Sequence, residues 1–452
     1  MKKLMYLCAI AVFILVTSGF ASMVYASTIR VGLVRAFYNQ NSITISTTSI
    51  DVGRGRANGS FEVVRTLNSP AGFTVRMSNG QVVVQAGGET VFTFVNDSDG
   101  GRQIRATGGG IISMGSDNFR GVIEFRPSGG QVSAINVICI EEYIYGVLSM
   151  EMSPHFHIEA LRAQAVAART FAMYTKNRGT YSSRGFDICD RSSCCQAYRG
   201  TYREYEIMRQ AVRDTRGLMV FKPGSNEPVL TPYFSSSGGS TDCVENVWGG
   251  VYAHLTGVWD FYEQNPRIWS RTYTWAQLTA AVRAHAPGAN IGTVTGVSIT
   301  EERLGRVQEL TFIGTNGQWT ATREQVSDIF RHISRRLYSR NFTISGAVEG
   351  GGSTIYITCG DITQQAPVSN LYVVDSFGNV VPANNTHVFD GVALGQPTQT
   401  TVTDADGTGI TINGRGWGHG VGMSQQGANS MAQAGYDFRS ILLHYYSGVE
   451  IR

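Results

Sequence analysis

The sequence predicts an α+β protein, and three observations support this fold class. Residues 27–139 alternate in the manner of β-strands, between turns rich in Gly, Asn, Asp and Ser. Residues 158–176 instead repeat their apolar side chains at helical spacing. Hydrophobic residues make up 42% of the 452 residues, which excludes a disordered chain and supplies enough apolar surface for a sizeable core.

The first part of the chain, residues 27–139, is expected to be β-rich. Its strand-like segments include Thr28–Val34, Ser42–Thr47, Phe61–Thr66, Gln81–Ala86 and Thr90–Val95.

Residues 140–345 change to a mixed helix and strand pattern, and we assign them to a central core. The expected helices are Glu141–Met150, Ile158–Lys176, Tyr202–Arg216, Trp275–His285 and Arg323–Tyr338, the last after a Thr322/Gln325 capping box. The expected strands between them are Leu218–Phe221, Val229–Phe234, Val294–Thr300 and Arg306–Ile313.

The remaining residues are predicted to form two parts. Residues 346–410 are strand-like and rich in Gly, Thr, Asn and Asp, which indicates a β insertion. Residues 411–452 return to the core through a glycine-rich turn and two short helices, Gln425–Ala434 and Phe438–Tyr446.

The N-terminus, residues 1–26, predicts export. Lys2 and Lys3 precede an apolar run and a small-residue end, as in a secretory signal. The uncharged stretch Leu4–Ala26 is also long enough for a membrane anchor, so a cleaved signal peptide and a retained anchor both stay open. Either way, we expect the protein at the outer face of the cytoplasmic membrane or in the cell wall.

The charge balance argues against nucleic acid as a partner. Lys and Arg total 37 against 34 Asp and Glu, which leaves a net charge of only +3. Nucleic-acid binding by bulk charge requires a much stronger basic excess.

A cluster of three cysteines, Cys189, Cys194 and Cys195, lies within seven residues. Three thiolates at this spacing supply most of a tetrahedral zinc shell. An exported chain can instead oxidise two of them to a disulfide and leave one spare thiol. The spacing by itself leaves both alternatives open.

A single glutamate, Glu151, follows a helical stretch and lies between two methionines. Apolar surroundings raise the pKa of a carboxyl group, which suits a general acid that protonates a leaving oxygen. The simpler alternative is a glutamate that caps the next helix. For the nearby His155 and His157 the sequence leaves three roles open: acid/base partners, metal ligands or surface residues.

A second candidate site is the run Asn413–Gln426, in which every second residue from Gly414 to Gly422 is glycine. The glycines let the backbone approach a ligand, while Arg415, Trp417 and His419 lie between them. A dinucleotide loop is excluded because too few residues follow for a βαβ unit. An extended polar ligand such as a sugar fits better.

A third segment ends a strand in Ser235, Ser236 and Ser237 without the Gly-x-Ser-x-Gly pattern of a serine nucleophile.

Together these segments resemble the stage II sporulation protein D family, also called the amidase-enhancer family. The resemblance is carried by residues 141–147, Glu151-Met152, 159–170, 233–239, 247–250 and 414–425. It is tight over 139–270 and 412–452 and loose elsewhere.

The resemblance implies a peptidoglycan lytic transglycosylase that cleaves glycan strands, typically during endospore formation, after an amidase has removed the stem peptides. Glu151 takes the position of the single catalytic acid/base. A glycosidase that uses water needs a second carboxylate, for which Asp187, Asp190 and Glu245 stay open. Arg415, Trp417, His419, Gln425 and Ser235–Ser237 are implied to hold the glycan. The alternative is a non-catalytic glycan-binding activator of a cell-wall amidase.

The same resemblance implies structural zinc, but the cysteine cluster departs from the family pattern. Relatives that bind zinc have an upstream His, a Cys and then a His-Cys pair before Gln-x-Tyr. Here Cys189 and Cys195 fit, Cys194 replaces a His, and Ser183 or Arg184 stands where the upstream His is expected. His155, His157 or Cys243 would have to complete the site. A disulfide from Cys194 or Cys195 to a distant cysteine is the competing interpretation.

Overall fold

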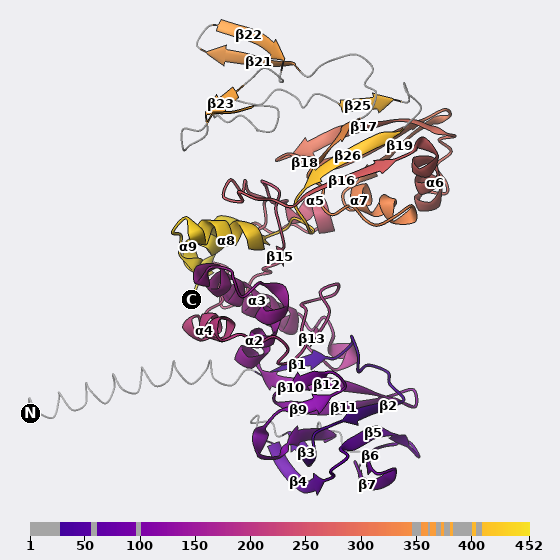
Figure 1. Cartoon of the computed structure of the whole chain (residues 1–452), viewed down its shortest axis with the longest axis vertical. Coiled ribbons are helices and arrows are strands. Elements are labelled where there is room, and N and C mark those ends of the chain that lie inside the picture. The colour runs from indigo at the N-terminus through magenta and orange to yellow at the C-terminus, as the bar shows by residue number, and fades with distance from the viewer. Residues whose placement is uncertain are drawn as a thin grey trace, which may run out of the picture. The chain divides into compact units, whose positions relative to one another are not determined.

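The computed structural model describes residues 28–55, 61–95, 101–345, 354–359, 362–367, 372–374, 380–382, 400–403 and 409–452. Helices and strands are mixed throughout these residues, which confirms the predicted α+β class (Figure 1). The predicted leader, residues 1–26, lies outside them. In the described part of the chain no helix is long and apolar enough to span a membrane.

The chain divides into two compact units at Pro232–Tyr233. Unit 1 holds the described residues up to Pro232 together with Gly435–Leu442 and Gly448–Arg452; unit 2 holds Tyr233–Ala434 and Leu443–Ser447. This division falls inside the range 140–345 that the sequence pattern groups as one core.

Unit 1 is built on two sheets, with strand orders β13–β1–β12–β11–β8–β3–β4 and β10–β9–β2–β5–β6–β7. Their strands are β1 (Thr28–Gly32), β2 (Ser42–Ile45), β3 (Ser49–Gly55), β4 (Phe61–Asn68), β5 (Phe73–Ser78), β6 (Gln81–Ala86), β7 (Glu89–Thr93), β8 (Gln103–Ala106), β9 (Ile112–Met114), β10 (Asp117–Phe119), β11 (Val122–Ser128), β12 (Gln131–Cys139) and β13 (Ile188–Cys189). The β-rich N-terminal region is therefore confirmed.

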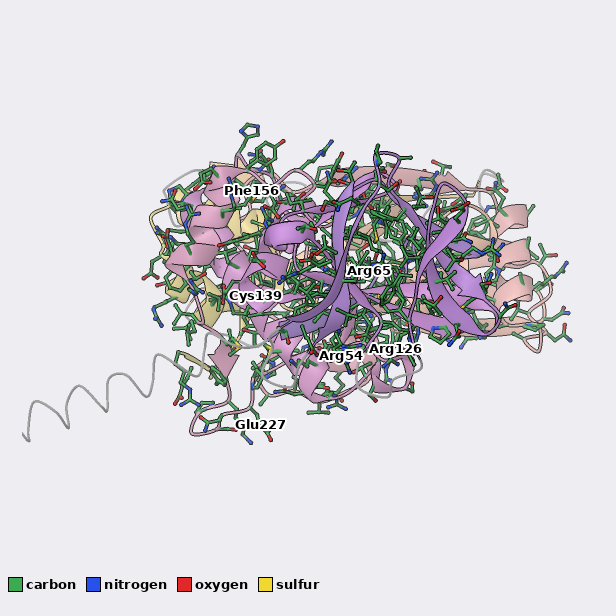
Figure 2. All side chains as sticks on the ribbon, turned by 90° about the horizontal axis from the view of Figure 1, so that it is seen from below. Arg54, Arg65, Arg126, Cys139, Phe156 and Glu227 are labelled. Atoms are coloured by element: carbon green, nitrogen blue, oxygen red, sulfur yellow. A yellow bond between two sulfur atoms is a disulfide. The ribbon has the colours of Figure 1, made fainter. Side chains whose placement is uncertain are left out.

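Alternation explains why these segments form strands. In β1, Ile29 and Val31 are fully buried while Thr28 is exposed, as a sheet with one core face requires. A buried Glu124 on β11 is neutralised by Arg30, at 2.6 Å, and by Arg126, labelled in Figure 2, at 3.1 Å.

Three helices, α2 (Ile140–Glu151), α3 (Ile158–Asn177) and α4 (Glu206–Asp214), pack on one another in unit 1 (Figure 1). Arg169 of α3 and Glu141 of α2 form a buried ion pair at 2.6 Å that joins two of them. Helix α4 starts later than the predicted Tyr202 because Arg203 has a φ of 56°, outside the helical region. Strands β14 (Val220–Phe221) and β28 (Glu450–Ile451) pair beside them.

Unit 2 contains the sheets β16–β26–β20 and β19–β18–β17–β25 and the small pairs β15–β27, β21–β22 and β23–β24. Its strands are β15 (Tyr233–Phe234), β16 (Ile268–Tyr273), β17 (Val294–Arg303), β18 (Arg306–Gly314), β19 (Gly317–Thr322), β20 (Phe342–Ser345), β21 (Thr354–Cys359), β22 (Ile362–Pro367), β23 (Tyr372–Val374), β24 (Val380–Pro382), β25 (Thr400–Thr403), β26 (Ile410–Arg415) and β27 (Met423–Ser424). Its helices are α5 (Val244–Trp248), α6 (Trp275–His285), α7 (Gln325–Asp328) and α8 (Gln425–Gln433). Helix α9 (Phe438–Tyr445) follows α8 in the chain.

The helix predicted at Arg323–Tyr338 is wrong over most of its length. The structure has α7 and a single 3₁₀ turn at Ile329–His332, and the chain then continues without helix. Thr322 donates its N–H to the Gln325 side chain, but its own side chain caps nothing, whereas Thr274 and Gln277 form a complete capping box at α6. Without that cap, packing of Leu337 into the unit 2 core decides the local path.

Candidate functional site

Glu151 is the last residue of α2, where the chain turns toward α3. Its Oε1 accepts a hydrogen bond from the backbone N–H of Ala197 at 2.8 Å. Burial raises the pKa of Glu151, and the Ala197 N–H opposes that shift because it stabilises the charged form. The half-buried carboxyl therefore has the raised pKa that its apolar sequence context predicts.

The Ala197 amide is held by the residues on both sides of it. The Gln196 side chain donates to the Ala168 carbonyl at 3.2 Å and accepts from the Tyr143 hydroxyl at 3.1 Å. The Tyr198 hydroxyl donates to Asn136 at 2.7 Å. Because these contacts are buried, the donor that faces Glu151 has a fixed position.

The cysteine cluster begins directly before this segment. The structure joins Cys189 to Cys194 in a disulfide and leaves Cys195 as a thiol that donates to the Tyr181 hydroxyl at 3.4 Å. Burial raises the pKa of the Cys195 thiol. The disulfide therefore forms within the cluster rather than to a distant cysteine.

The same three sulfur atoms lie within 4.8 Å of one another, which suits one metal ion in the reduced state. Among the described residues no histidine or carboxylate joins this group. His157 instead accepts from the Glu159 N–H and caps α3, and Cys243, in unit 2, accepts from Arg303. Thiolates are ligands that zinc prefers, so the type of donor fits this metal. The cluster supplies three ligands, and it can do so only when the disulfide is absent.

The acidic residues downstream of α3 have structural partners. Asp187 accepts from the Arg30 N–H at 2.9 Å, and Asp190 accepts from the Arg35 N–H at 2.9 Å. Burial raises the pKa of Asp190 to about 6. Glu245 is exposed on α5 in unit 2.

In unit 2, the serine segment binds a buried carboxylate. The hydroxyls of Ser236 and Ser237 donate to the two oxygens of Glu263 at 2.5 and 2.6 Å, and the Gly238 N–H donates at 2.8 Å. Ser235 is half-buried, and its carbonyl accepts from the Gln426 N–H at 3.0 Å. The sequence analysis missed Glu263, because 25 to 27 residues separate it from these donors.

The glycine run packs directly on the serine segment. Ser236 and Trp417 exchange both backbone hydrogen bonds, at 2.7 and 3.1 Å. Gly416 has a φ of 86°, and a Cβ there would lie 2.8 Å from the carbonyls of Ser236 and Ser237. Two segments 180 residues apart in the chain are thus brought together, and only glycine allows the approach.

Trp417 lies inside a stack. The Tyr338 ring lies 3.9 Å from it at 17°, and the guanidinium of Arg267 lies 3.7 Å from its centre. Both faces of the indole are therefore covered in this conformation, and its edge is what a ligand can reach.

The other predicted glycan residues of unit 2 have different surroundings. His419 packs between Phe234 and Trp248, and its Nδ1 accepts from the Val421 N–H. Burial lowers the pKa of His419 to about 4, so its ring is neutral at pH 7. Arg415 is half-buried at the end of β26, and Gln425 is buried at the start of α8.

Several partners that shape the two segments were not predicted. Ala197 acts through its backbone, which no side-chain pattern reveals, although it lies inside the Gln-x-Tyr motif at Gln196–Tyr198. Tyr338 and Arg267 gave no sequence signal, since nothing local links them to Trp417. Glu151 and the cluster of Cys189, Cys194 and Cys195 belong to unit 1, and the serine and glycine segments belong to unit 2.

Comparison with known proteins identifies the family. The protein-family model described as SpoIID, stage II sporulation protein, matches residues 128–221 of this chain, a range that includes Glu151 and Ala197. An uncharacterised protein of Brachyspira hyodysenteriae is 30% identical over 346 residues, 75% of this chain and 74% of that protein. Stage II sporulation protein D of Bacillus subtilis is 26% identical over 336 residues, 70% of this chain and 76% of that protein.

A further relative is the amidase enhancer of Bacillus subtilis, which is 28% identical over 310 residues. The match spans 68% of this chain but only 40% of that protein. The chain belongs to the stage II sporulation protein D family, as the sequence resemblance indicated.

Proposed function

We propose that the protein is a lytic transglycosylase that cleaves the glycan backbone of peptidoglycan, with Glu151 as the single acid/base. The observation that carries this proposal is the environment of Glu151: a half-buried carboxyl with a raised pKa, held by one backbone N–H donor. A group of this kind retains its proton closer to neutral pH, as a general acid must.

The reaction needs two successive proton transfers, both at the Glu151 carboxyl. Protonated Glu151 gives its proton to the glycosidic oxygen, and the bond between that oxygen and the muramic C1 breaks. The carboxylate then takes the proton of the C6 hydroxyl on the same sugar, whose oxygen bonds to C1 and closes a 1,6-anhydro ring. No water is consumed, so the scheme needs no second carboxylate.

The backbone donor fits both halves of this cycle. A single N–H leaves the carboxyl with a raised pKa for the first step. It also stabilises the carboxylate that forms, which limits the cost of ionisation in a half-buried position. Arg415, Trp417, His419, Gln425 and the segment Ser235–Ser237 are proposed to form and support a surface for the glycan.

The test is product analysis with Glu151→Gln on peptide-free glycan strands. The wild-type protein should release products with 1,6-anhydromuramic ends, and the variant should lose about 10²–10⁴-fold in rate. Glu142→Gln is the matched control, since Glu142 also lies on α2 with a pKa raised by burial. The proposal fails if Glu151→Gln keeps its activity while its melting temperature equals that of the wild type.

We further propose that the protein is exported and acts in endospore formation or cell-wall remodelling, with a cell-wall amidase as its partner and the membrane as a second contact if the leader is retained. The names of its relatives, stage II sporulation protein D and amidase enhancer, support this role. An amidase would supply peptide-free strands as the substrate.

The second candidate function is a non-catalytic protein that binds glycan and activates an amidase. The name of one relative, the amidase enhancer of Bacillus subtilis, favours it. This alternative predicts unchanged glycan length and faster peptide release when amidase is added. Strand-length analysis without amidase separates the two functions.

For the reduced cysteine cluster we propose structural zinc, bound by the thiolates of Cys189, Cys194 and Cys195. The mutual spacing of the three sulfurs supports it. The disulfide and the zinc site exclude each other, because both use Cys189 and Cys194.

A further inference from the structure

Unit 2 has a surface cavity of about 500 Å³, a size that accommodates a sugar unit. It is lined by Arg271, Thr272, Tyr273, Gln277, Ser334 and Arg335, with Ile333 and Tyr338. The lining residues thus include two arginines, several hydroxyl-bearing residues and a glutamine.

Among the residues that the structure describes, the two arginines of this cavity have no acidic partner. Arg336 pairs with Glu324 at 2.7 Å and with Asp328 at 3.2 Å. In contrast, across the described ranges no carboxylate lies within 4.0 Å of the nitrogens of Arg271 or Arg335. Two arginines that line one cavity, without a carboxylate partner in the described part of the chain, favour an anionic ligand.

Arg271 is held in place for such a ligand. Its Nη1 donates to the Arg335 carbonyl at 2.7 Å, and its guanidinium lies 4.3 Å from the centre of the Tyr338 ring. A fixed guanidinium loses less side-chain entropy on binding than a free one.

The cavity wall is bonded to the glycine-rich run. The Tyr338 carbonyl accepts from the Gly418 N–H at 2.8 Å, and the Ser339 hydroxyl donates to the Arg415 carbonyl at 2.5 Å. The Tyr338 ring has one face toward Trp417 and contacts Arg271 as well. A chain bound along the glycine run therefore has the cavity beside it.

We propose that this cavity binds a carboxylate-bearing sugar, namely the lactyl carboxylate of a muramic residue from which an amidase has removed the peptide. The inference rests on the proposed function, which makes peptide-free glycan the substrate. Cutting the amide that joins the peptide to the lactyl group leaves a carboxylate there. Arg271 and Arg335 recognise this carboxylate, and the hydroxyls and Gln277 recognise the ring, so the cavity selects strands that the amidase has already processed.

The experiment measures binding by the full chain in detergent, with a short peptide-free glycan of alternating N-acetylglucosamine and N-acetylmuramic acid. Comparison ligands are the same glycan with its carboxylates converted to methyl esters, and polyglycerol phosphate. We expect the free-acid glycan to bind at least about tenfold more tightly than the ester, a difference that shrinks with added salt.

The two variants are Arg335→Gln and Arg271→Gln. Arg335 is exposed, so its substitution removes no buried contact. Each should weaken binding of the free acid about tenfold and leave binding of the ester unchanged. Arg283→Gln is the control, since it removes the same charge from the exposed side of α6 outside the cavity. Equal affinity for acid and ester, tighter binding of polyglycerol phosphate, or an equal effect of Arg283→Gln would overturn the assignment.

Binding and cleavage separate this inference from the proposed function. In Glu151→Gln, acid-selective binding that persists while anhydro products disappear supports both. Acid-selective binding by a wild-type protein that makes no anhydro products supports the cavity and contradicts the transglycosylase. Cleavage by a protein that does not distinguish acid from ester contradicts the cavity alone.

Discussion

Two glutamates, the half-buried Glu151 in unit 1 and the buried Glu263 in unit 2, show how hydrogen bonding decides what a carboxyl group does. Among the described residues, Glu151 accepts from a single donor, the Ala197 N–H, and burial raises its pKa. Glu263 in unit 2 accepts from two serine hydroxyls and one backbone N–H. A carboxyl with one donor is suited to exchanging a proton, whereas one with three donors serves to fix the chain around it.

The largest stability effect is expected at Glu263. Glu263→Ala leaves three buried donors unsatisfied and should lower the free energy of unfolding by at least about 3 kcal/mol. Glu151→Gln keeps an acceptor for Ala197 and should change it by less than about 1 kcal/mol. Urea denaturation of both variants checks this contrast, and a smaller effect at Glu263 than at Glu151 would contradict it.

A second buried acid in unit 2, Asp260, extends the comparison to pH. Burial raises its pKa from 3.8 to about 6, with Glu263 adding to the rise. The folded state thus holds this proton more tightly than the unfolded chain. The stabilisation is complete below pH 4 and is lost as pH rises through about 6, with an upper bound of about 3 kcal/mol.

Asp260→Asn removes this dependence. Relative to the wild type, the variant should gain stability between pH 4 and pH 6 and show a constant difference above pH 7. Thermal unfolding across this range measures it. A difference that is flat from pH 4 to pH 8 would show that Asp260 does not titrate in this window.

The cysteine cluster gives a smaller effect that depends on its oxidation state. Opening the Cys189–Cys194 loop should cost about 2 kcal/mol from chain entropy. In oxidised protein, Cys194→Ser should therefore destabilise and Cys195→Ser should not. In reduced protein supplied with zinc, both substitutions should lower metal content, measured by mass spectrometry; a reduced wild-type protein without zinc would refute the metal proposal.

The smallest effect concerns the pH dependence of Glu151 itself. In the proposed mechanism the first step needs the protonated form of Glu151, so kcat/KM should fall about tenfold per pH unit above the pKa of Glu151, which burial raises above 4.5. Initial rates between pH 4 and pH 9 measure this limb. A limb at or below the ordinary glutamate pKa would mean that burial does not tune the proposed acid.

The local pattern predicted much of this molecule. Helix α6 matches its predicted bounds, and α2 and α3 match to within one residue, because apolar spacing and the chain break near Pro154 are local features. Glu151 was found in the same way, since its methionine neighbours are adjacent in sequence. The helix predicted through Tyr338 was wrong because packing, not spacing, sets the path of that segment.

The sequence by itself therefore determined the α+β class, the family and the glutamate with an acid's surroundings. Only the tertiary structure supplied its partner, since the Ala197 N–H comes from a residue 46 positions away and from the backbone that all residues share. The same holds for Glu263 beneath the serines and for the arginine cavity beside Tyr338. Residue types and short spacings can be read along a chain, whereas hydrogen bonds and charges between distant residues exist only once the fold brings them together.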